Sequence, residues 1–186
     1  SIDTMKPAVA RAAVEAGATL INDITGFSHP EMIQLARETE LDICVMHMQG
    51  NPQTMQKNPH YQEGIVPFLN QWFKEKIESL MTQGIKPERI ILDPGIGFGK
   101  TVADNLEIIH NLPLFKQLGF RVLLGVSRKS FLGKILNKQT QELLPATLAA
   151  NTLAVSYNVD IIRVHDVKEH RSIIDFIDVY NEHKRV

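Results

Sequence analysis

The sequence predicts an α/β protein, a (β/α)8 barrel of which about six of the eight βα units are present. Short apolar segments rich in Ile, Val and Leu alternate with longer segments of helical periodicity, which indicates parallel strands joined by right-handed crossovers. Nearly every apolar segment also ends in polar residues, as expected where all strand carboxyl ends meet at one mouth. A full barrel takes about 250 residues. Since the chain has 186, we expect one domain over residues 1–186 that lacks roughly its first two βα units.

The strands are expected in short apolar segments, because parallel strands are covered on both faces. Ile2 and Asp3 resemble the tail of a first strand, and no initiator Met precedes them. We therefore expect the chain to be the remainder of a longer protein. The other predicted strands are residues 19–24, 42–47, 89–93, 121–126 and 160–165.

The segments between the strands have helical periodicity. Pro7 and Pro30 suit the first turn of a helix, and Gly17 and Gly84 lie just past predicted helix ends. An open doubly wound sheet is the alternative architecture, but it would concentrate its site near a single switch point. The predicted helices are residues 7–16, 30–39, 62–83, 103–117, 130–136, 145–157 and 168–182.

Composition narrows the class of partner. The formal net charge is −1 and the sequence pI is about 6.6, so no basic surplus favours nucleic acid or an anionic membrane as a partner. The single cysteine, Cys44, excludes an internal disulfide framework and suits a reducing compartment. Apolar runs are short, and neither a signal peptide nor a membrane span is predicted. We therefore expect a cytoplasmic protein.

The sequence DPGIGFGKT at residues 93–101 is the most informative motif, because it directly follows an apolar strand. Glycines let the backbone approach a ligand, and Asp93 stands at a strand carboxyl end, where barrels bind substrates. The motif is nearly a phosphate-binding P-loop, but that pattern needs glycine where this chain has Pro94. A plain helix cap is the other interpretation of Asp93.

Two further strand ends place polar residues on an apolar face. Strand alternation puts Asn22 on the face of Leu20, which indicates either a ligand contact or a core amide satisfied by backbone. Arg163 and His165 share a face with Ile161. They could hold a phosphate or diphosphate, or Arg163 could pair with a nearby carboxylate.

The sequence GVSRKS at residues 125–130 brings cations and hydroxyls to a predicted helix start, a place suited to anions, although serine-rich helix starts are also common N-caps. His47 has no matching cluster of His, Cys or Glu, so a structural or pocket-lining role is predicted for it and no metal site in this chain. Four further histidines are predicted at the surface: His60, His110, His170 and His183.

Six motifs in order resemble the dihydropteroate synthase family, the folate-pathway enzymes that sulfonamides inhibit. The motifs are SIDT at 1–4, INDI at 21–24, MHMQG at 46–50, DPGIGFGKT at 93–101, GVSRKSF at 125–131 and RVHDV at 163–167. The resemblance implies a (β/α)8 barrel and a transferase. The family condenses 6-hydroxymethyl-dihydropterin diphosphate with p-aminobenzoate, giving dihydropteroate and diphosphate.

The resemblance also implies roles for individual residues. The implied catalytic residues are Asp93, Lys129, Arg163 and His165. The pterin pocket would be lined by Asp3, Asn22, Met46, Asp93, Gly125, Ser127 and Lys129. Arg163 and His165 would hold the diphosphate, and the p-aminobenzoate site would be bordered by Phe98, Lys129 and Ser130.

The resemblance implies Mg²⁺ as a cofactor, held with the diphosphate by an Asn in family segments that precede Ser1. Without those segments we expect weak or absent turnover. A homodimer through residues 145–157 and 168–182 is implied as well. The apolar residues there also fit ordinary packing of helices on the barrel; they are Leu148, Leu153, Ile174 and Ile177.

Two rival functions remain. One is the pterin-binding module of a corrinoid methyltransferase, which binds the same pterin ring but needs no aryl site at residues 127–130. The other is a non-catalytic homologue that acts through its surface.

Overall fold

The computed structural model describes residues 1–183 and contains a curled sheet of six parallel strands in the order β1-β2-β3-β4-β5-β6. Each strand pairs with the next one along the chain. This half-barrel confirms the predicted fold. The strands are β1 (Ile2–Asp3), β2 (Leu20–Asp23), β3 (Asp42–Met46), β4 (Ile90–Asp93), β5 (Arg121–Leu124) and β6 (Ile161–Ile162).

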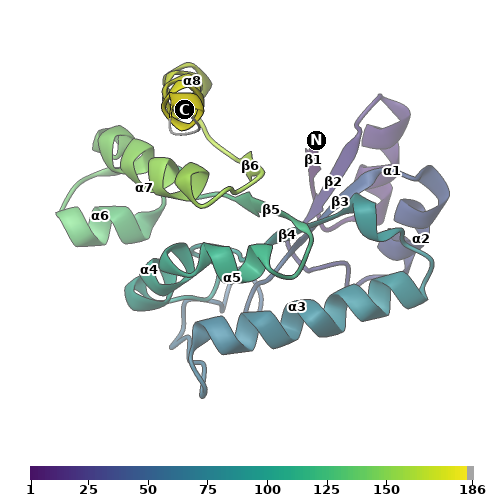
Figure 1. The fold of residues 1–186 in the computed structure, drawn as a ribbon. Helices are drawn as coiled ribbons and strands as arrows, with labels where there is room; N and C mark the ends of the chain where they lie inside the picture. Colours follow the sequence, from purple (N-terminus) through teal and green to yellow (C-terminus); the bar gives the residue numbers. More distant parts are fainter. Residues whose placement is uncertain (184–186) are drawn as a thin grey trace.

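Helices follow the strands in turn and cover the outer side of the curled sheet (Figure 1). α1 contacts α2, α3 contacts α4, α4 contacts α6 and α7, and α7 contacts α8. The α-helices are α1 (Pro7–Glu15), α2 (Pro30–Thr39), α3 (Ile65–Thr82), α4 (Val102–His110), α5 (Leu112–Lys116), α6 (Ser130–Leu136), α7 (Leu144–Ser156) and α8 (Val167–His183). Short 3-10 turns lie at Pro87–Arg89 and Thr140–Glu142.

Three predicted boundaries were wrong for identifiable reasons. The single helix predicted over 103–117 is divided at Asn111, because Pro113, in the first turn of α5, has no backbone N–H with which to continue α4. Arg89, predicted in a strand, lies in the turn that Pro87 begins. The last strand is shorter than predicted, so Arg163 and His165 lie just beyond β6.

Alternation along the strands separates two apolar layers. One side of the sheet carries residues such as Ile43 and Leu92, which belong to the large core shared with the helices. The other, inner side carries a small cluster that we call the floor, formed by Leu20, Cys44, Ile91, Leu123 and Ile161. The residues two positions further along each strand face the same side, above the floor. They are Asn22, Met46, Asp93, Gly125 and Arg163.

None of the helices within residues 1–183 is long and apolar enough to cross a membrane. Cys44 is fully buried with a free thiol, and burial raises the pKa of that thiol well above its usual value.

Candidate active site

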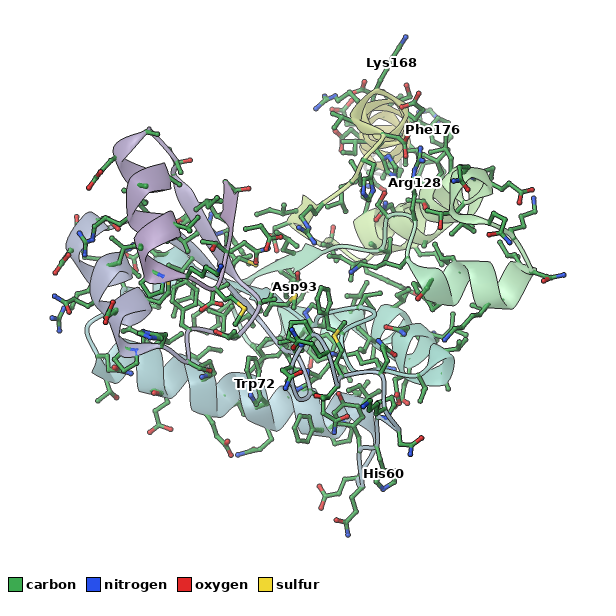
Figure 2. The ribbon with its side chains drawn as sticks, turned by 180° about the vertical axis from the view of Figure 1, so that it is seen from behind. His60, Trp72, Asp93, Arg128, Lys168 and Phe176 are labelled. Atoms are coloured by element: carbon green, nitrogen blue, oxygen red, sulfur yellow. The ribbon has the colours of Figure 1, made fainter. Side chains whose placement is uncertain are left out.

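Side chains from separate strand ends meet above the floor. Asn22 and Asp93 are each 3% exposed and Met46 is 1% exposed. Gly125 lies against the guanidinium of Arg163, since an added Cβ there would be in van der Waals contact with Nε at 3.5 Å. Figure 2 shows Asp93 at the middle of the molecule, between the α1–α2 end and the α7–α8 end. The motifs found along the sequence therefore converge in one place.

Asp3, Asn22 and Arg163 form a polar group that joins the two ends of the sheet. Nδ2 of Asn22 donates to Oδ2 of Asp3 over 3.2 Å, and Nη1 of Arg163 donates to the same oxygen. The carboxylate partner anticipated for Arg163 is therefore Asp3. Among the described residues, nothing donates to the buried Oδ1 of Asn22. A buried acceptor without a donor is costly unless a ligand or water supplies one, so backbone bonding does not account for this amide.

Asp93 is a buried carboxyl surrounded by cations. Burial raises its pKa, while the hydrogen bond from the Gly95 amide to Oδ1, 2.8 Å, opposes that rise. The charges of Lys129, Arg163 and Lys100 oppose it further. Burial is the largest influence and the pKa of Asp93 is raised overall, while the Gly95 amide and the surrounding cations act in favour of the ionised form.

Lys129 stands at the start of α6 and turns toward the glycine loop, residues 93–101. Its Nζ lies 4.2 Å from the ring centroid of Phe98, a cation–π contact. Burial lowers the pKa of Lys129 and the charge of Asp93 opposes that shift. Phe98 is half-buried, and Ser130, the residue after Lys129, is exposed.

The glycine loop is packed tightly against the end of β3. Gly95 has φ 69°, and a Cβ there would meet the carbonyl oxygen of His47 at 1.9 Å. Lys100 is 3% exposed, and its ammonium contacts Nδ1 of His47 at 3.0 Å. A P-loop lysine reaches outward to phosphate, whereas this one turns inward. The structure thus agrees with the exclusion of a P-loop.

His47 lies among aromatic rings and is not part of a metal cluster. Its ring centroid is 5.0 Å from that of Trp72 and 5.4 Å from that of Phe68. Burial, and then the charge of Lys100, lowers the pKa of His47 to about 3. Within the part of the chain that the structure describes, no group of three or more His, Cys, Asp or Glu residues could hold a metal ion.

A polar pocket of about 460 Å³ lies next to Arg163 and Lys129, where the β5–α6 and β6–α8 loops meet. Oγ of Ser127 lies 2.8 Å from Nδ1 of His165 and accepts from the His165 amide at 3.2 Å. Because three cations line it, the pocket suits an anion. The lining residues are Gly125, Ser127, Arg128, Lys129, Arg163, Val164 and His165.

Sequence reasoning missed Arg128 and Asp166, which pair with each other beside this pocket. The sequence did contain a signal for this pair, because a cation follows β5 and a carboxylate follows β6. The surface assignment of His170 was wrong: it is 1% exposed, with Nε2 2.8 Å from Nδ2 of Asn151 and Nδ1 2.7 Å from the Asp166 carbonyl oxygen. The other three histidines predicted at the surface are exposed: His60, His110 and His183.

Comparison with known proteins gives one consistent result. The family model described as "Pterin binding enzyme" matches residues 1–165. Dihydropteroate synthase of Escherichia coli K12 is 43% identical over 169 residues, which are 91% of this chain and 60% of that protein. The chain thus spans about three fifths of that relative's length.

Solved structures agree with the sequence matches. Yersinia pestis dihydropteroate synthase in a sulfonamide drug complex superposes with a TM-score of 0.93 at 36% identity, covering 97% of this chain and 66% of that one. The Xanthomonas albilineans enzyme in complex with 7,8-dihydropteroate superposes with a TM-score of 0.89 at 32% identity, covering 96% and 65%.

Proposed function

The chain belongs to the pterin-binding enzyme family, and from that premise we propose that it is the pterin- and diphosphate-binding part of a dihydropteroate synthase. The reaction joins 6-hydroxymethyl-dihydropterin diphosphate to p-aminobenzoate and releases diphosphate. One observation carries the proposal: Asn22, Asp93, Lys129 and Arg163 come from separate segments and stand together above an apolar floor. We take residues 1–186 as one domain, since one large core runs from Ala10 to Ala154.

The pterin ring fits the buried polar groups. Its amino and ring N–H groups are donors, and its carbonyl is an acceptor. The Asp93 carboxylate and the unsatisfied Oδ1 of Asn22 would accept from such donors, while the Lys129 ammonium can donate to the carbonyl. Asp3 holds the Asn22 amide in place. Met46 would give the pterin pocket an apolar wall, and Gly125 would let the ring come close to the backbone.

The chemical step that this arrangement suits is dissociative. The C–O bond at the exocyclic methylene breaks, and the electron pair leaves with diphosphate. The arylamine nitrogen then attacks the methylene cation and loses a proton. Arg163 and His165, which line the polar pocket, would stabilise the negative charge on the leaving group. Lys129 lies between this pocket and Phe98, so it would contact both substrates and align them.

The p-aminobenzoate site is proposed beside Phe98, Lys129 and Ser130. The ring of Phe98 offers an apolar face to an aryl group, and the exposed Ser130 hydroxyl could meet its carboxylate. Ser127 is proposed as a contact that also orients His165. Mg²⁺ is proposed to accompany the diphosphate. The described residues form no acidic or histidine cluster fit to hold it, so we assign it no ligand and no step here.

We further propose a homodimer through α7 and α8. Phe176 is 70% exposed and stacks on Tyr180 with ring centroids 6.4 Å apart. Leu153 is also exposed, whereas Ile177 is buried, and Leu148 and Ile174 are partly buried as expected for packing within the protomer. Exposed apolar patches of this kind favour association. Phe176→Asp should shift the chain to monomer in size-exclusion chromatography, whereas Leu106→Asp on α4 should not.

The buried free thiol of Cys44 supports the proposal of a reducing, cytoplasmic location.

Calorimetric titration tests the proposed function. The chain should bind 6-hydroxymethylpterin and inorganic diphosphate, and p-aminobenzoate should bind once both are present. Asp93→Asn should weaken pterin binding, and Arg163→Ala and Lys129→Ala should weaken diphosphate binding. Arg11→Ala, which removes an exposed ion pair with Glu38, is the matched control.

The same titration separates the rivals. Pterin binding without ternary p-aminobenzoate binding would favour the corrinoid methyltransferase module. If Lys129→Ala and Arg163→Ala bound both ligands as the unsubstituted chain does, the site assignment would fail and a non-catalytic protein would be favoured. Turnover by these 186 residues alone is expected to be weak or absent.

A further inference from the structure

Lys100 is a buried cation that the proposed reaction does not use. It is 3% exposed and is not among the described residues that line the polar pocket. Its Nζ lies 3.0 Å from Nδ1 of His47, 3.0 Å from the carbonyl oxygen of Phe98 and 3.3 Å from that of His47. Three acceptors match the three hydrogens of an ammonium, so hydrogen bonding favours the charged form while burial opposes it.

His47 is placed to be a fixed and uncharged acceptor. Burial and the charge of Lys100 lower the pKa of its imidazole to about 3, so Nδ1 accepts from Lys100 and the ring proton lies on Nε2. The edges and faces of Tyr61, Phe68 and Trp72 hold the ring, with centroids 5.0 to 6.1 Å away. The Lys100 ammonium is thus anchored to the end of β3 and not to a mobile surface group.

Lys100 lies directly behind the turn that caps Asp93. A Cβ at Gly95 would be 3.3 Å from Nζ of Lys100, and the Gly95 amide donates to Oδ1 of Asp93. Asp93 is buried, and burial alone would favour its neutral form. The other groups that act on Asp93 and its surroundings are Lys129 after β5, Arg163 after β6, Asp3 on β1 and the Cys44 thiol on β3. On the other side, Asp104 in α4 acts on Lys100 and opposes the lowering of its pKa.

The three cations near Asp93 differ in one respect. Lys129 and Arg163 line the polar pocket, so a bound anion would engage their charges. Arg163 is also paired with Asp3. Lys100 does not line the pocket, and the hydrogen-bond acceptors given for it among the described residues are neutral, so an anion in the pocket would not pair directly with its charge.

We propose that Lys100 is a positioning residue that fastens the glycine loop to β3 and, through its charge, favours the ionised form of Asp93 for ligand binding. The ionisation of Asp93 belongs to this chain alone, whereas its use in holding a pterin rests on the proposed function. The energetic link is reciprocal, because Asp93 must stabilise the charge of Lys100 by as much as Lys100 stabilises that of Asp93. Burial lowers the pKa of Lys100 to about 7, and Asp93 opposes that shift.

The test is a ¹³C NMR titration of the aspartate carboxyls in the chain without ligand, with the Asp93 signal assigned by its absence from Asp93→Asn. Lys100→Met should raise the titration midpoint of Asp93 by about one pKa unit, and Lys100→Arg, which keeps the charge, should restore most of it. Lys86→Met removes an exposed lysine paired with Glu40 and should leave the midpoint unchanged. An unshifted Asp93 midpoint in folded Lys100→Met would overturn the proposal.

The reciprocal measurement does not depend on Lys100→Met folding. Asp93→Asn keeps an oxygen that can accept from Gly95, and the pKa of Lys100, followed at its ¹³Cε, should fall relative to the unsubstituted chain. No fall would overturn the proposal.

Pterin binding adds a readout that separates this proposal from the function. In Lys100→Met the acid limb of 6-hydroxymethylpterin affinity should move to higher pH, with affinity little changed well above it. A purely structural role would lower affinity equally at every pH and would contradict the charge effect. If the unsubstituted chain bound no pterin, the proposed function would fail while the two titrations would still decide the role of Lys100.

Discussion

The guanidinium of Arg128 donates two hydrogen bonds to the carboxylate of Asp166, from Nε to Oδ2 over 3.0 Å and from Nη2 to Oδ1 over 2.5 Å. Arg128 has φ 54°, and its amide donates to Oγ1 of Thr147 over 3.0 Å. Arg128 therefore joins the loop after β5 to the loop after β6 and to α7, and Figure 2 shows it at the α7–α8 end of the molecule. Lys129 and His165, the sequence neighbours of the pair, both line the polar pocket.

Arg128→Lys should weaken binding of inorganic diphosphate by a few-fold to about tenfold. A lysine keeps the charge but cannot make the two parallel bonds that fix the loops. Titration calorimetry measures the affinity, with circular dichroism as the check on folding. Arg121→Lys alters the Arg–Asp42 pair at the other end of β5 and should bind as the unsubstituted chain does. Equal diphosphate affinities in the two variants would show that the Arg128–Asp166 pair does not contribute to the site.

Gly95→Ala should lower the free energy of unfolding by about 2 kcal/mol or more beyond the effect of Gly119→Ala. Both glycines have positive φ, 69° and 84°, so both alanines carry the same kind of backbone strain. Only at Gly95 would the new Cβ collide with the His47 carbonyl, while at Gly119 no described atom lies within 4 Å. Urea denaturation measures both. Similar decreases in the free energy of unfolding of the two variants would mean that the glycine loop moves away from His47 at no energetic cost.

Asn22→Leu should stabilise the empty chain by up to about 1 kcal/mol and weaken pterin binding by about tenfold or more. The leucine removes a buried acceptor for which residues 1–183 supply no donor, and with it the group that a ligand would satisfy. Asn151→Leu is the matched control. Its Oδ1 is likewise unsatisfied within the described chain. Asn151 lies on α7, where its Nδ2 contacts His170 of α8, and it is outside the proposed pterin site, so pterin affinity should not change. Loss of stability in Asn22→Leu without loss of binding would contradict the assignment.

His47 should make the chain sensitive to acid. Its pKa of about 3 in the folded chain lies below the value of 6.5 expected when it is unfolded. Between these values the unfolded chain binds the proton first, so this contribution to stability is present above pH 6.5 and is lost as the pH falls toward 3. The slope due to His47 approaches ~1.4 kcal/mol per pH unit.

Comparing the unsubstituted chain with His47→Gln isolates that slope from the titration of the carboxylates. Urea denaturation at a series of pH values should show the unsubstituted chain losing stability relative to His47→Gln as the pH falls below 6.5, because glutamine has no proton to bind. Parallel curves of stability against pH would show that the folded protein protonates His47 as readily as the unfolded chain does.

The fold and the strand-end residues could be predicted because both follow from periodicity. Leu20 and Asn22, or Ile161 and Arg163, differ by two positions and so face the same side of the sheet. A polar residue one step above an apolar floor is visible in the sequence once the strand is located. The break before α5 was also visible at Pro113, and it was missed because the apolar periodicity continues through it.

The partners of individual side chains could not be predicted, because they come from distant segments. Lys100 in a Gly-Lys-Thr sequence suggests phosphate binding, and only the location of His47, 53 positions away, shows that the ammonium turns inward. His170 fits a polar helix surface until α7 packs beside α8 and brings Asn151 to it. Such contacts depend on tertiary packing and leave no local pattern.

The strand order, in which every strand pairs with its neighbour in the chain, has a kinetic consequence. Each βα unit can add to the one before it by closing a short loop, which keeps the entropic cost of each step small. The Asp3–Arg163 pair is different, because it spans 160 positions and cannot form until the intervening units are in place. A fluorescence or exchange probe at that pair would therefore report the last event of refolding, after the floor has assembled.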